Sequence, residues 1–367
     1  MKRIGTVSYN IYCNFTNYGS ALQTWALHQA IKRAGSEPIL IDYCPEILAD
    51  KDPLNPFKHM WDQDEESRRM CELTMPAIRE NFAKFDIFYH ECFDRSSQKY
   101  TAQNFNEIGA ENLNGFVCGS DTIFCIDEFK GFDDGYYAHY PEMKGRSVSY
   151  AASFGDSHFD EESYKTLNER LKNFKAIGIR EEQMIPYVKN HVGVPVQRTI
   201  DPTLLLTSYD YDVITAKRQY SAPYLLLYTR RYDSNMEAFA ERLAEEKGLR
   251  IVEISLRAAN ADKGHIMRYD AGVEEFLSLV KHSSFVVTNS FHGLIFAVQY
   301  RRPMVVFTRE QADSKINELL QLMDLKNSRF TTGYEEYRDI DYDKVHQNIA
   351  VARQSSLDFL KMELGLL

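Results

Sequence analysis

One histidine in the sequence stands where proton-transfer chemistry is expected. His292 follows a β-branched run at residues 285–288 and falls in the first turn of an apolar segment at 291–300 that has the pattern of a helix. Backbone N–H groups and the helix dipole at such a turn favour a bound anion. Among the ten histidines, His292 is our candidate general acid or base, with Asn289 and Ser290 as binding residues beside it. A purely structural histidine is the alternative.

An aspartate and an arginine follow two other expected strands. Asp121 comes after one strand through Gly119 and Ser120, and Arg180 ends another. Ligands of parallel α/β sheets bind at the carboxyl ends of the strands. Asp121 could therefore orient or deprotonate a hydroxyl, and Arg180 could form paired hydrogen bonds to a carboxylate or phosphate. The structural alternatives are that Asp121 caps a turn and that Arg180 pairs with a neighbouring glutamate.

Two further segments have the composition of ligand-binding loops. Residues 17–23 separate the first expected strand from its helix, where Gly19 permits close approach to the backbone and free amides can bind an anion or a hydroxyl. An ordinary N-cap by Ser20 is the alternative. Residues 149–155, S-Y-A-A-S-F-G, end another strand. The candidate binding residues in these two segments are Asn17, Tyr18, Gly19, Ser20, Gln23, Ser153 and Phe154.

The motifs of several other enzyme classes are missing. No G-x-G-x-x-G follows a strand, and the P-loop, H-E-x-x-H and G-x-S-x-G patterns do not occur. The six cysteines form no C-x-x-C pair. Asp-x-Asp pairs occur at 62/64, 210/212 and 341/343, all in polar stretches typical of solvated loops. We therefore expect neither a bound metal nor a cofactor.

The elements that must position these residues alternate short β-branched runs with helical patterns, which is typical of a parallel α/β sheet. Expected strands lie at 4–9, 38–43, 116–118, 147–151, 176–179 and 196–200, and expected helices at 20–34, 161–174 and 181–189. After an irregular stretch at 206–222, strands are expected at 224–228, 250–254, 285–288 and 304–307, and helices at 235–247, 273–281, 291–300, 313–325 and 344–362.

Length, composition and charge limit the number of domains and the kinds of ligand to be expected. With 367 residues, 44% of them hydrophobic, two or three globular domains are expected. We expect an N-terminal lobe at 1–208 with a helical insertion at about 44–112, a C-terminal lobe at 209–342, and a helix at 343–367 that packs back on the N-terminal lobe. Ligands would bind in the cleft between the lobes. The net charge of −10 gives no general surface for nucleic acid. Neither a signal peptide nor a membrane-spanning run is evident, so we expect a cytoplasmic protein.

Six motifs occur in an order and spacing that resemble the polysaccharide pyruvyl transferases. They are Asn17-Tyr18-Gly19, Gly119-Ser120-Asp121, the 149–155 segment, Arg180-Glu181, Asp201-Pro202-Thr203 and Ser290-Phe291-His292-Gly293. The resemblance covers about residues 4–325, without the 44–112 stretch. It implies an α/β fold similar to the GT-B glycosyltransferases, with two Rossmann-like lobes of parallel strands. It also implies transfer of a pyruvyl group from phosphoenolpyruvate to a sugar.

The resemblance has one departure that bears on anion binding. Many relatives carry a base in the turn before the histidine, whereas Asn289-Ser290-Phe291 stands here. Phosphate binding would then fall to Arg180, Arg230 or Lys315. In this interpretation His292 is the general acid or base, Asp121 orients or deprotonates the acceptor hydroxyl, and Arg180 clamps an anion.

The expected function is ketal formation in surface or exopolysaccharide biosynthesis. The partners would be phosphoenolpyruvate and a sugar or a lipid- or nucleotide-linked glycan, without a metal or redox cofactor. Peripheral association with a membrane is compatible with such an acceptor. Two alternatives stay open, since a fold does not decide function: a GT-B glycosyltransferase that uses a nucleotide sugar, and a non-catalytic carbohydrate-binding protein on the same scaffold.

Overall fold

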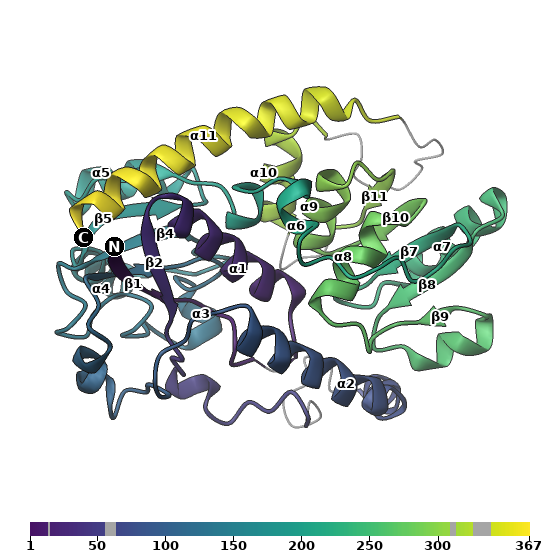
Figure 1. Ribbon diagram of the computed structural model, residues 1–367, viewed down its shortest axis with the longest axis horizontal. Coiled ribbons are helices and arrows are strands. Elements are labelled where there is room, and N and C mark those ends of the chain that lie inside the picture. Colours follow the sequence, from purple (N-terminus) through teal and green to yellow (C-terminus); the bar gives the residue numbers. More distant parts are fainter. Residues whose placement is uncertain (14, 56–63, 309–312, 326–338) are drawn as a thin grey trace.

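Two parallel sheets flanked by helices lie side by side in the computed structural model (Figure 1). The structure describes residues 1–367 except 14, 56–63, 309–312 and 326–338. Each sheet with its helices forms a Rossmann-like lobe, as expected from the alternation of strands and helices along the chain.

The first lobe is built on a six-stranded sheet of order β2-β1-β3-β4-β5-β6 in which all neighbours are parallel. The strands are β1 (Lys2–Val7), β2 (Ser36–Leu40), β3 (Gly115–Cys118), β4 (Ser147–Ala152), β5 (Phe174–Ile179) and β6 (Val196–Arg198). Its helices include α1 (Tyr18–Arg33), α3 (Ile126–Phe129), α4 (Glu161–Leu171) and α5 (Met184–His191). The central strands β3 and β4 are buried throughout, because helices cover both faces of a parallel sheet.

The second lobe is built on a five-stranded parallel sheet of order β11-β10-β7-β8-β9. The strands are β7 (Tyr224–Tyr228), β8 (Arg250–Ile254), β9 (Ile266–Met267), β10 (Phe285–Thr288) and β11 (Met304–Val306). Its helices include α6 (Ser208–Tyr211), α7 (Ser234–Lys247), α8 (Val273–Lys281), α9 (Phe291–Gln299) and α10 (Asp313–Leu322). The two-residue strand β9 was not expected, because so short a pairing leaves no periodic pattern.

Helix α1 lies between the lobes and is buried on almost every side. Its apolar residues pack against both lobes, which explains why the helix has no wide polar face. Tyr18 stacks on Phe276 of α8, with ring centroids 4.4 Å apart, and its hydroxyl donates to the carbonyl of Ala271 (2.7 Å). The first turn of α1 is thereby locked to the second lobe.

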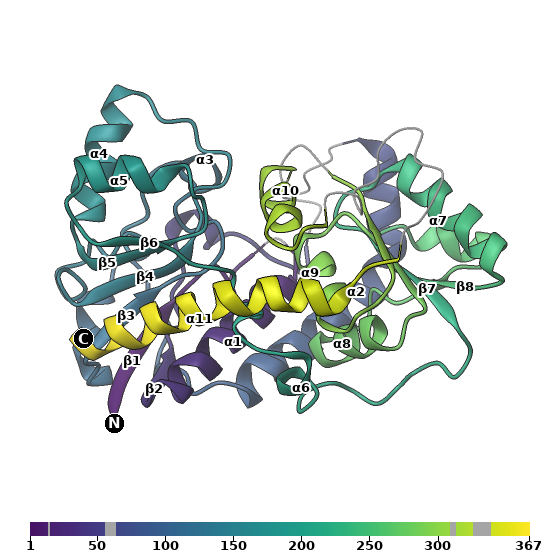
Figure 2. The same cartoon turned by 90° about the horizontal axis from the view of Figure 1, so that it is seen from above.

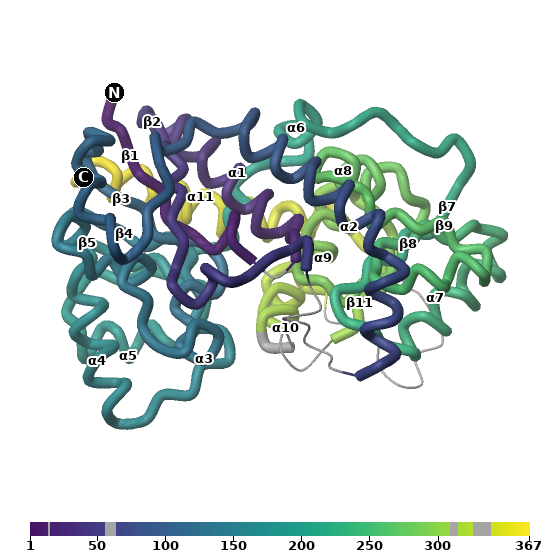
Figure 3. The backbone as a smooth tube through the Cα atoms, turned by 90° about the horizontal axis from the view of Figure 1, so that it is seen from below, coloured from purple at the N-terminus to yellow at the C-terminus, as the bar shows by residue number. Residues whose placement is uncertain are grey.

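Helix α2 (Glu65–Glu91), in the segment expected to be an insertion, runs from the first lobe along the second (Figure 3). Asp64 caps it by accepting from the N–H of Ser67 (2.9 Å). The Asn81 amide donates to the carbonyl of Ala271 (2.6 Å). Lys84 pairs with Glu275 of α8 (2.8 Å). These contacts tie the helix to the lobe that carries α8.

The C-terminal helix α11 (Tyr342–Leu366) crosses both lobes (Figure 2). Near its start, the His346 ring is 3.1 Å from the carbonyl of Val298 in the second lobe. Further along, the hydroxyl of Ser356 accepts from the N–H of Ile200, which follows β6 (3.1 Å). Lys2 of β1 donates to the carbonyl of Gly365 (2.8 Å). None of the described helices is long and apolar enough to span a membrane.

Candidate active site

The turn that presents His292 is held by short polar side chains. β10 ends at Thr288, whose hydroxyl donates to the carbonyl of Tyr228 (2.7 Å) and accepts from the N–H of Ser290 (3.0 Å). Ser290 caps α9, because its hydroxyl accepts from the N–H of Gly293 (3.1 Å). His292 is thereby placed in the first turn of α9, with only 7% of its surface exposed.

Gly19 of α1 lies directly against the His292 ring. A Cβ atom on Gly19 would lie 1.9 Å from Nδ1 and 2.4 Å from Cγ of His292, so the two lobes meet here through a backbone without a side chain. Asn17 is the N-cap of α1, since its side chain accepts from the N–H groups of Gly19 (2.9 Å) and Ser20 (3.4 Å). The group that approaches the backbone at Gly19 is the His292 ring, so ligand binding at this turn stays a prediction, and the alternative of an N-cap by Ser20 is wrong.

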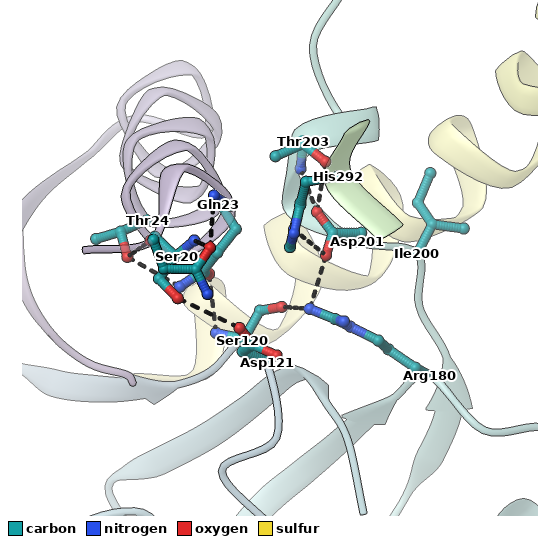
Figure 4. Close-up of polar contacts among 12 residues, drawn as sticks. Ser20, Gln23, Thr24, Ser120, Asp121, Arg180, Ile200, Asp201, Thr203 and His292 are labelled. Atoms are coloured by element: carbon teal, nitrogen blue, oxygen red, sulfur yellow. Dashed lines mark hydrogen bonds and ion pairs between the residues drawn. The ribbon is translucent and has the colours of Figure 1, made fainter. Parts of the chain in front are cut away.

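Asp201 lies between Arg180 and His292 (Figure 4). One of its oxygens, Oδ2, is 2.7 Å from Nη2 of Arg180 and 3.5 Å from Nε2 of His292. The other, Oδ1, accepts from the N–H (2.9 Å) and the hydroxyl (2.5 Å) of Thr203. Nη2 of Arg180 also donates to the hydroxyl of Ser120. A single carboxylate therefore links the ends of β5 and β6 in the first lobe to α9 in the second.

Asp201 carries a negative charge although it is buried. Burial by itself would raise the pKa of the carboxyl, but Arg180, His292 and the hydrogen bonds from Thr203 hold this pKa well below its usual range. The charge of Arg180 is therefore matched by a carboxylate inside the protein. Arg180 is less available as a free anion clamp than the sequence suggested.

Ser120 is held in place by hydrogen bonds to Gln23 of α1 and to Ser8, which follows β1. Its N–H donates to Oε1 of Gln23 (3.2 Å), and its carbonyl accepts from the hydroxyl of Ser8 (3.0 Å). The Gln23 amide donates to the same Ser8 hydroxyl (2.9 Å). Gln23 is completely buried, so it positions the loop after β3 from within the protein. Its place in the structure is behind the site, next to Ser120.

Asp121 is half-buried on the loop after β3, beside Ser20. Its Oδ2 is 3.4 Å from the hydroxyl of Ser20. The preceding Gly119 has a φ of +143°, and a Cβ there would lie 2.0 Å from the carbonyl oxygen of Tyr150. Only glycine fits at this position, because the backbone conformation and the neighbouring strand both exclude a side chain. The loop directs the Asp121 carboxylate toward the start of α1 (Figure 4).

Two of the predicted binding residues have side chains that are packed in the hydrophobic core. Phe154 is buried in the core of the first lobe, with its ring centroid 5.3 Å from that of Phe124. Tyr18 is equally buried, with its hydroxyl donated to Ala271. We remove both from the set of candidate ligand-binding side chains. Their aromatic character reflects packing, which sequence alone does not separate from ligand stacking.

The glutamates next to Arg180 have other partners. Glu181 accepts a hydrogen bond from the Ser153 hydroxyl, and Glu182 pairs with Arg198 (2.8 Å). The structural alternative, in which Arg180 pairs with one of them, is therefore wrong. Its partner is Asp201, to which the sequence motif alone assigns no role.

Arg230 stands at the end of β7, facing the first lobe. Asn289 bridges the ends of β7 and β10, because its side chain accepts from the N–H of Arg230 (2.9 Å) and donates to the carbonyl of Arg231 (2.6 Å). Burial raises the pKa of the Cys13 thiol to about 12, against the opposing effect of the nearby Arg230 charge. Within the described part of the chain, no carboxylate lies within ion-pair distance of Arg230.

Lys315 lies on α10 and lines a pocket that also contains Arg180 and Asp201. The residues predicted from sequence thus fall into three groups: a centre around His292, Arg230 on one side of this centre, and Lys315 on the other side. No group of three metal-ligating side chains occurs in the described ranges. Asp62, of the first Asp-x-Asp pair, falls outside them.

Comparison with known proteins identifies the scaffold. The complex of S. aureus MnaA with UDP has a TM-score of 0.51 and 15% identity, covering 98% of this chain and 88% of that one. A Listeria monocytogenes protein described as a UDP-N-acetylglucosamine 2-epimerase also has a TM-score of 0.51, with 14% identity and coverage of 100% and 98%. Likeness at such identities shows the fold alone, which is GT-B-like, with two Rossmann-like lobes. A search of the curated proteins found no match.

The chain also matches a protein-family model over most of its length. The model for polysaccharide pyruvyl transferase matches residues 17–311. This range begins at the cap of α1 and continues beyond β11, so it contains the Asn17 cap, the Asp121 loop, Arg180, Asp201 and the His292 turn. Because the match spans both lobes and all the loops that meet at the site, the chain belongs to the polysaccharide pyruvyl transferases, a family of transferases.

Proposed function

We propose that the protein transfers the pyruvyl group of phosphoenolpyruvate to two hydroxyls of a sugar, forming a cyclic ketal in the synthesis of a surface polysaccharide. The observation that carries the proposal is the position of His292, held between Gly19 and the ionised Asp201 at the start of α9. A histidine oriented by a carboxylate is an arrangement suited to general acid–base catalysis.

The reaction needs two proton transfers and one leaving group. A proton delivered to C3 of phosphoenolpyruvate makes a methyl group and leaves C2 electron-poor. A sugar hydroxyl attacks C2 and loses its proton to a base. The bond between C2 and the phosphate oxygen then breaks, and a second hydroxyl attacks C2 to close the ring. Two protons leave the two hydroxyls: one equals the proton that C3 gains, and the other is taken up by the departing phosphate. The reaction therefore needs no oxidant or reductant.

His292 is the residue we assign to deliver the proton to C3. Asp201 faces Nε2, which has no hydrogen-bond partner among the described residues. Nδ1 lies against Gly19. We assign Asp201 to orient the ring through Nε2, which leaves Nδ1 to exchange a proton with the substrate. Because Gly19 has no side chain, the ring fits closely against the start of α1, and this contact fixes its position.

Arg230 and the start of α9 are the groups we assign to the donor anion. Phosphoenolpyruvate carries a carboxylate and a phosphate, so it requires positive charge that the protein has not already neutralised. Arg180 is matched by Asp201, whereas Arg230 has no carboxylate partner in the described ranges. The backbone N–H groups of the first turn of α9 add a second anion-binding element. Asp121, beside Ser20, would accept the proton of the attacking hydroxyl.

The test is phosphate release from phosphoenolpyruvate in the presence of a panel of sugar glycosides, with the ketal methyl group followed by NMR. Wild-type protein should release phosphate with at least one glycoside, and His292→Gln should not. Glycosyl transfer from a UDP-sugar without phosphate release would instead identify a glycosyltransferase. Thermal stabilisation by saccharides without turnover of either donor would identify a binding protein. A cytoplasmic location and a lipid- or nucleotide-linked acceptor stay predictions.

A further inference from the structure

A pocket beside the catalytic centre contains more polar side chains than the proposed mechanism uses. It lies between the ends of β5 and β6 in the first lobe and helices α9 and α10 in the second. Its polar lining includes Arg180, Glu181, Arg198, Lys315 and Glu318. The donor anion assigned to Arg230 does not need this space.

Three residues that line the pocket each have a buried polar atom without a hydrogen-bond partner among the described residues: Nε of Arg180, Oε2 of Glu181 and Oδ2 of Asp201. Oδ2 of Asp201 is in the ion pair with Arg180, which leaves Nε of Arg180 and Oε2 of Glu181, on residues that are 9% and 6% exposed. An unpaired buried polar atom costs free energy, so such atoms indicate a missing partner. Nε of Arg180 can only donate, and Oε2 of an ionised Glu181 can only accept. A hydroxyl group can satisfy both kinds of atom, whereas a phosphate or carboxylate cannot donate to Glu181.

The charge of the pocket lining also favours a neutral ligand. Arg180, Arg198 and Lys315 are balanced by Glu181, Asp201 and Glu318. Burial and the nearby Glu181 raise the pKa of Glu318, as expected where two carboxyl groups line one pocket. A second anion would add to this repulsion. Arg230, by comparison, has no carboxylate partner within the described ranges. The region around Arg230 therefore favours an anion, whereas this pocket favours a neutral ligand.

Apart from Thr199, the remaining residues that line the pocket are apolar. Phe291, which precedes His292, is half-buried, and its ring faces the Arg180 guanidinium at 5.5 Å from the ring centroid. Leu319 and Leu322 of α10 line the same space. A sugar ring presents both C–H groups and hydroxyls, so a mixed apolar and hydroxyl-binding surface is complementary to it. The mixture would suit neither inorganic phosphate nor a purely apolar ligand.

Strand order places this pocket and Arg230 on opposite sides of His292. In the second sheet, β10 lies between β7, which leads to Arg230, and β11, which leads to α10. In the first sheet, β5 leads to Arg180, and strands β3 and β4 separate β5 from β1. Two substrates that enter from opposite sides would therefore meet at His292.

We propose that this pocket, bounded by Arg180, Glu181, Phe291 and α10, is the subsite that binds a neutral, polyhydroxylated sugar unit of the acceptor glycan. The inference rests on the proposed function, because it assigns the acceptor of that reaction. Glu181 is here a specificity-determining residue that accepts from an acceptor hydroxyl. Arg180 both holds Asp201 and donates to the same sugar unit through Nε.

The test uses 4-nitrophenyl glycosides of glucose, galactose and mannose as acceptors and compares Glu181→Gln with wild type. The substitution keeps the size of the side chain but puts an N–H₂ group where an acceptor is needed, so KM for the best glycoside should rise roughly tenfold or more. KM for phosphoenolpyruvate should stay within about twofold, because Arg230 is unchanged. Glu169→Gln, on the exposed face of α4, is the matched control and should change neither constant.

A second variant tests the pocket independently, in case Glu181→Gln disturbs the fold. Leu322→Trp, at the half-exposed end of α10, should fill the pocket and raise the glycoside KM without affecting phosphoenolpyruvate. Saturation-transfer NMR with the glycoside alone should show contacts in wild type that both variants lose. An unchanged glycoside KM in both variants of an active enzyme would overturn the subsite, as would a selective rise in the KM for phosphoenolpyruvate. Failure of wild type to release phosphate with any glycoside would overturn the proposed function instead.

Discussion

Adding one methyl group at Gly19 should disable the site without unfolding the protein. A Cβ in Gly19→Ala would lie 1.9 Å from Nδ1, 2.4 Å from Cγ and 2.5 Å from Cε1 of His292. These atoms belong to one face of the ring, so no small adjustment of a single atom relieves the clash. The start of α1 is fixed by the Asn17 cap and by the stacking of Tyr18 on Phe276. The His292 ring is therefore the part that has to move.

The size of the effect follows from this displacement. To reach ordinary contact the ring must retreat by about 1.5 Å, and a misplacement on the order of 1 Å costs about 100-fold in rate. We expect kcat to fall by about 100-fold or more, which corresponds to about 2.7 kcal/mol of transition-state stabilisation. In an open helix, alanine would instead favour folding by up to ~1 kcal/mol over glycine. At Gly19 this preference only partly offsets the cost of displacing a buried ring, about 1–3 kcal/mol, so the melting temperature of Gly19→Ala should fall by a few degrees while the protein stays folded.

The assay is steady-state phosphate release with phosphoenolpyruvate and the best glycoside, together with thermal melting. Gly365→Ala is the matched control, because Gly365 is also helical and a Cβ there meets nothing within 4 Å. It should leave kcat unchanged. Near-normal kcat in folded Gly19→Ala would refute the idea that contact with Gly19 positions the ring.

Three further predictions concern the charged residues of the site. His292→Gln should fold normally and lower kcat by about 10²–10⁴-fold, with a much smaller effect on phosphoenolpyruvate affinity, measured by turnover and calorimetry. Asp201→Asn should lower the free energy of unfolding by about 3–5 kcal/mol near neutral pH, because it leaves the buried Arg180 charge unpaired. Since the folded-state pKa of Asp201 is depressed, this difference should be full above about pH 4 and shrink as the pH falls further, as urea denaturation across pH can show. Arg230→Gln should raise KM for phosphoenolpyruvate and abolish thermal stabilisation by it, while an unchanged KM would remove Arg230 from donor binding.

The fold was largely predictable because its elements have strong local patterns. The strands at 224–228, 250–254 and 285–288 and the helix at 273–281 have the boundaries expected from sequence. Each is a continuous apolar or periodic run that ends at a clear change of composition. Elements without such a pattern, such as β9 and α6, were missed. The helix expected at 20–34 begins two residues after the observed start of α1, because Ser20 and Asn17 are both good caps and only the observed hydrogen bonds distinguish them.

The candidate site was predictable to the extent that strand ends can be recognised. His292, Asp121 and Arg180 all follow strands, and parallel strands bring their carboxyl ends to one edge. Tyr18 and Phe154 were misjudged, because an aromatic residue next to a motif looks the same in sequence whether it contacts a ligand or the core. Asp201 had no assigned role, because its ion-pair partner Arg180 lies on a different strand end.

The sequence by itself determined the α/β class, the two-lobed alternation and the positions of the polar turns, because backbone propensity and hydrophobic period act over a few residues. Only the tertiary structure decided which of these groups meet. Arg180 has Asp201 rather than a neighbouring glutamate as its partner, and His292 packs on Gly19 from the other lobe. Ion pairing and close packing depend on distances across sheets and between lobes, and those distances arise only when strand order and interlobe packing are established.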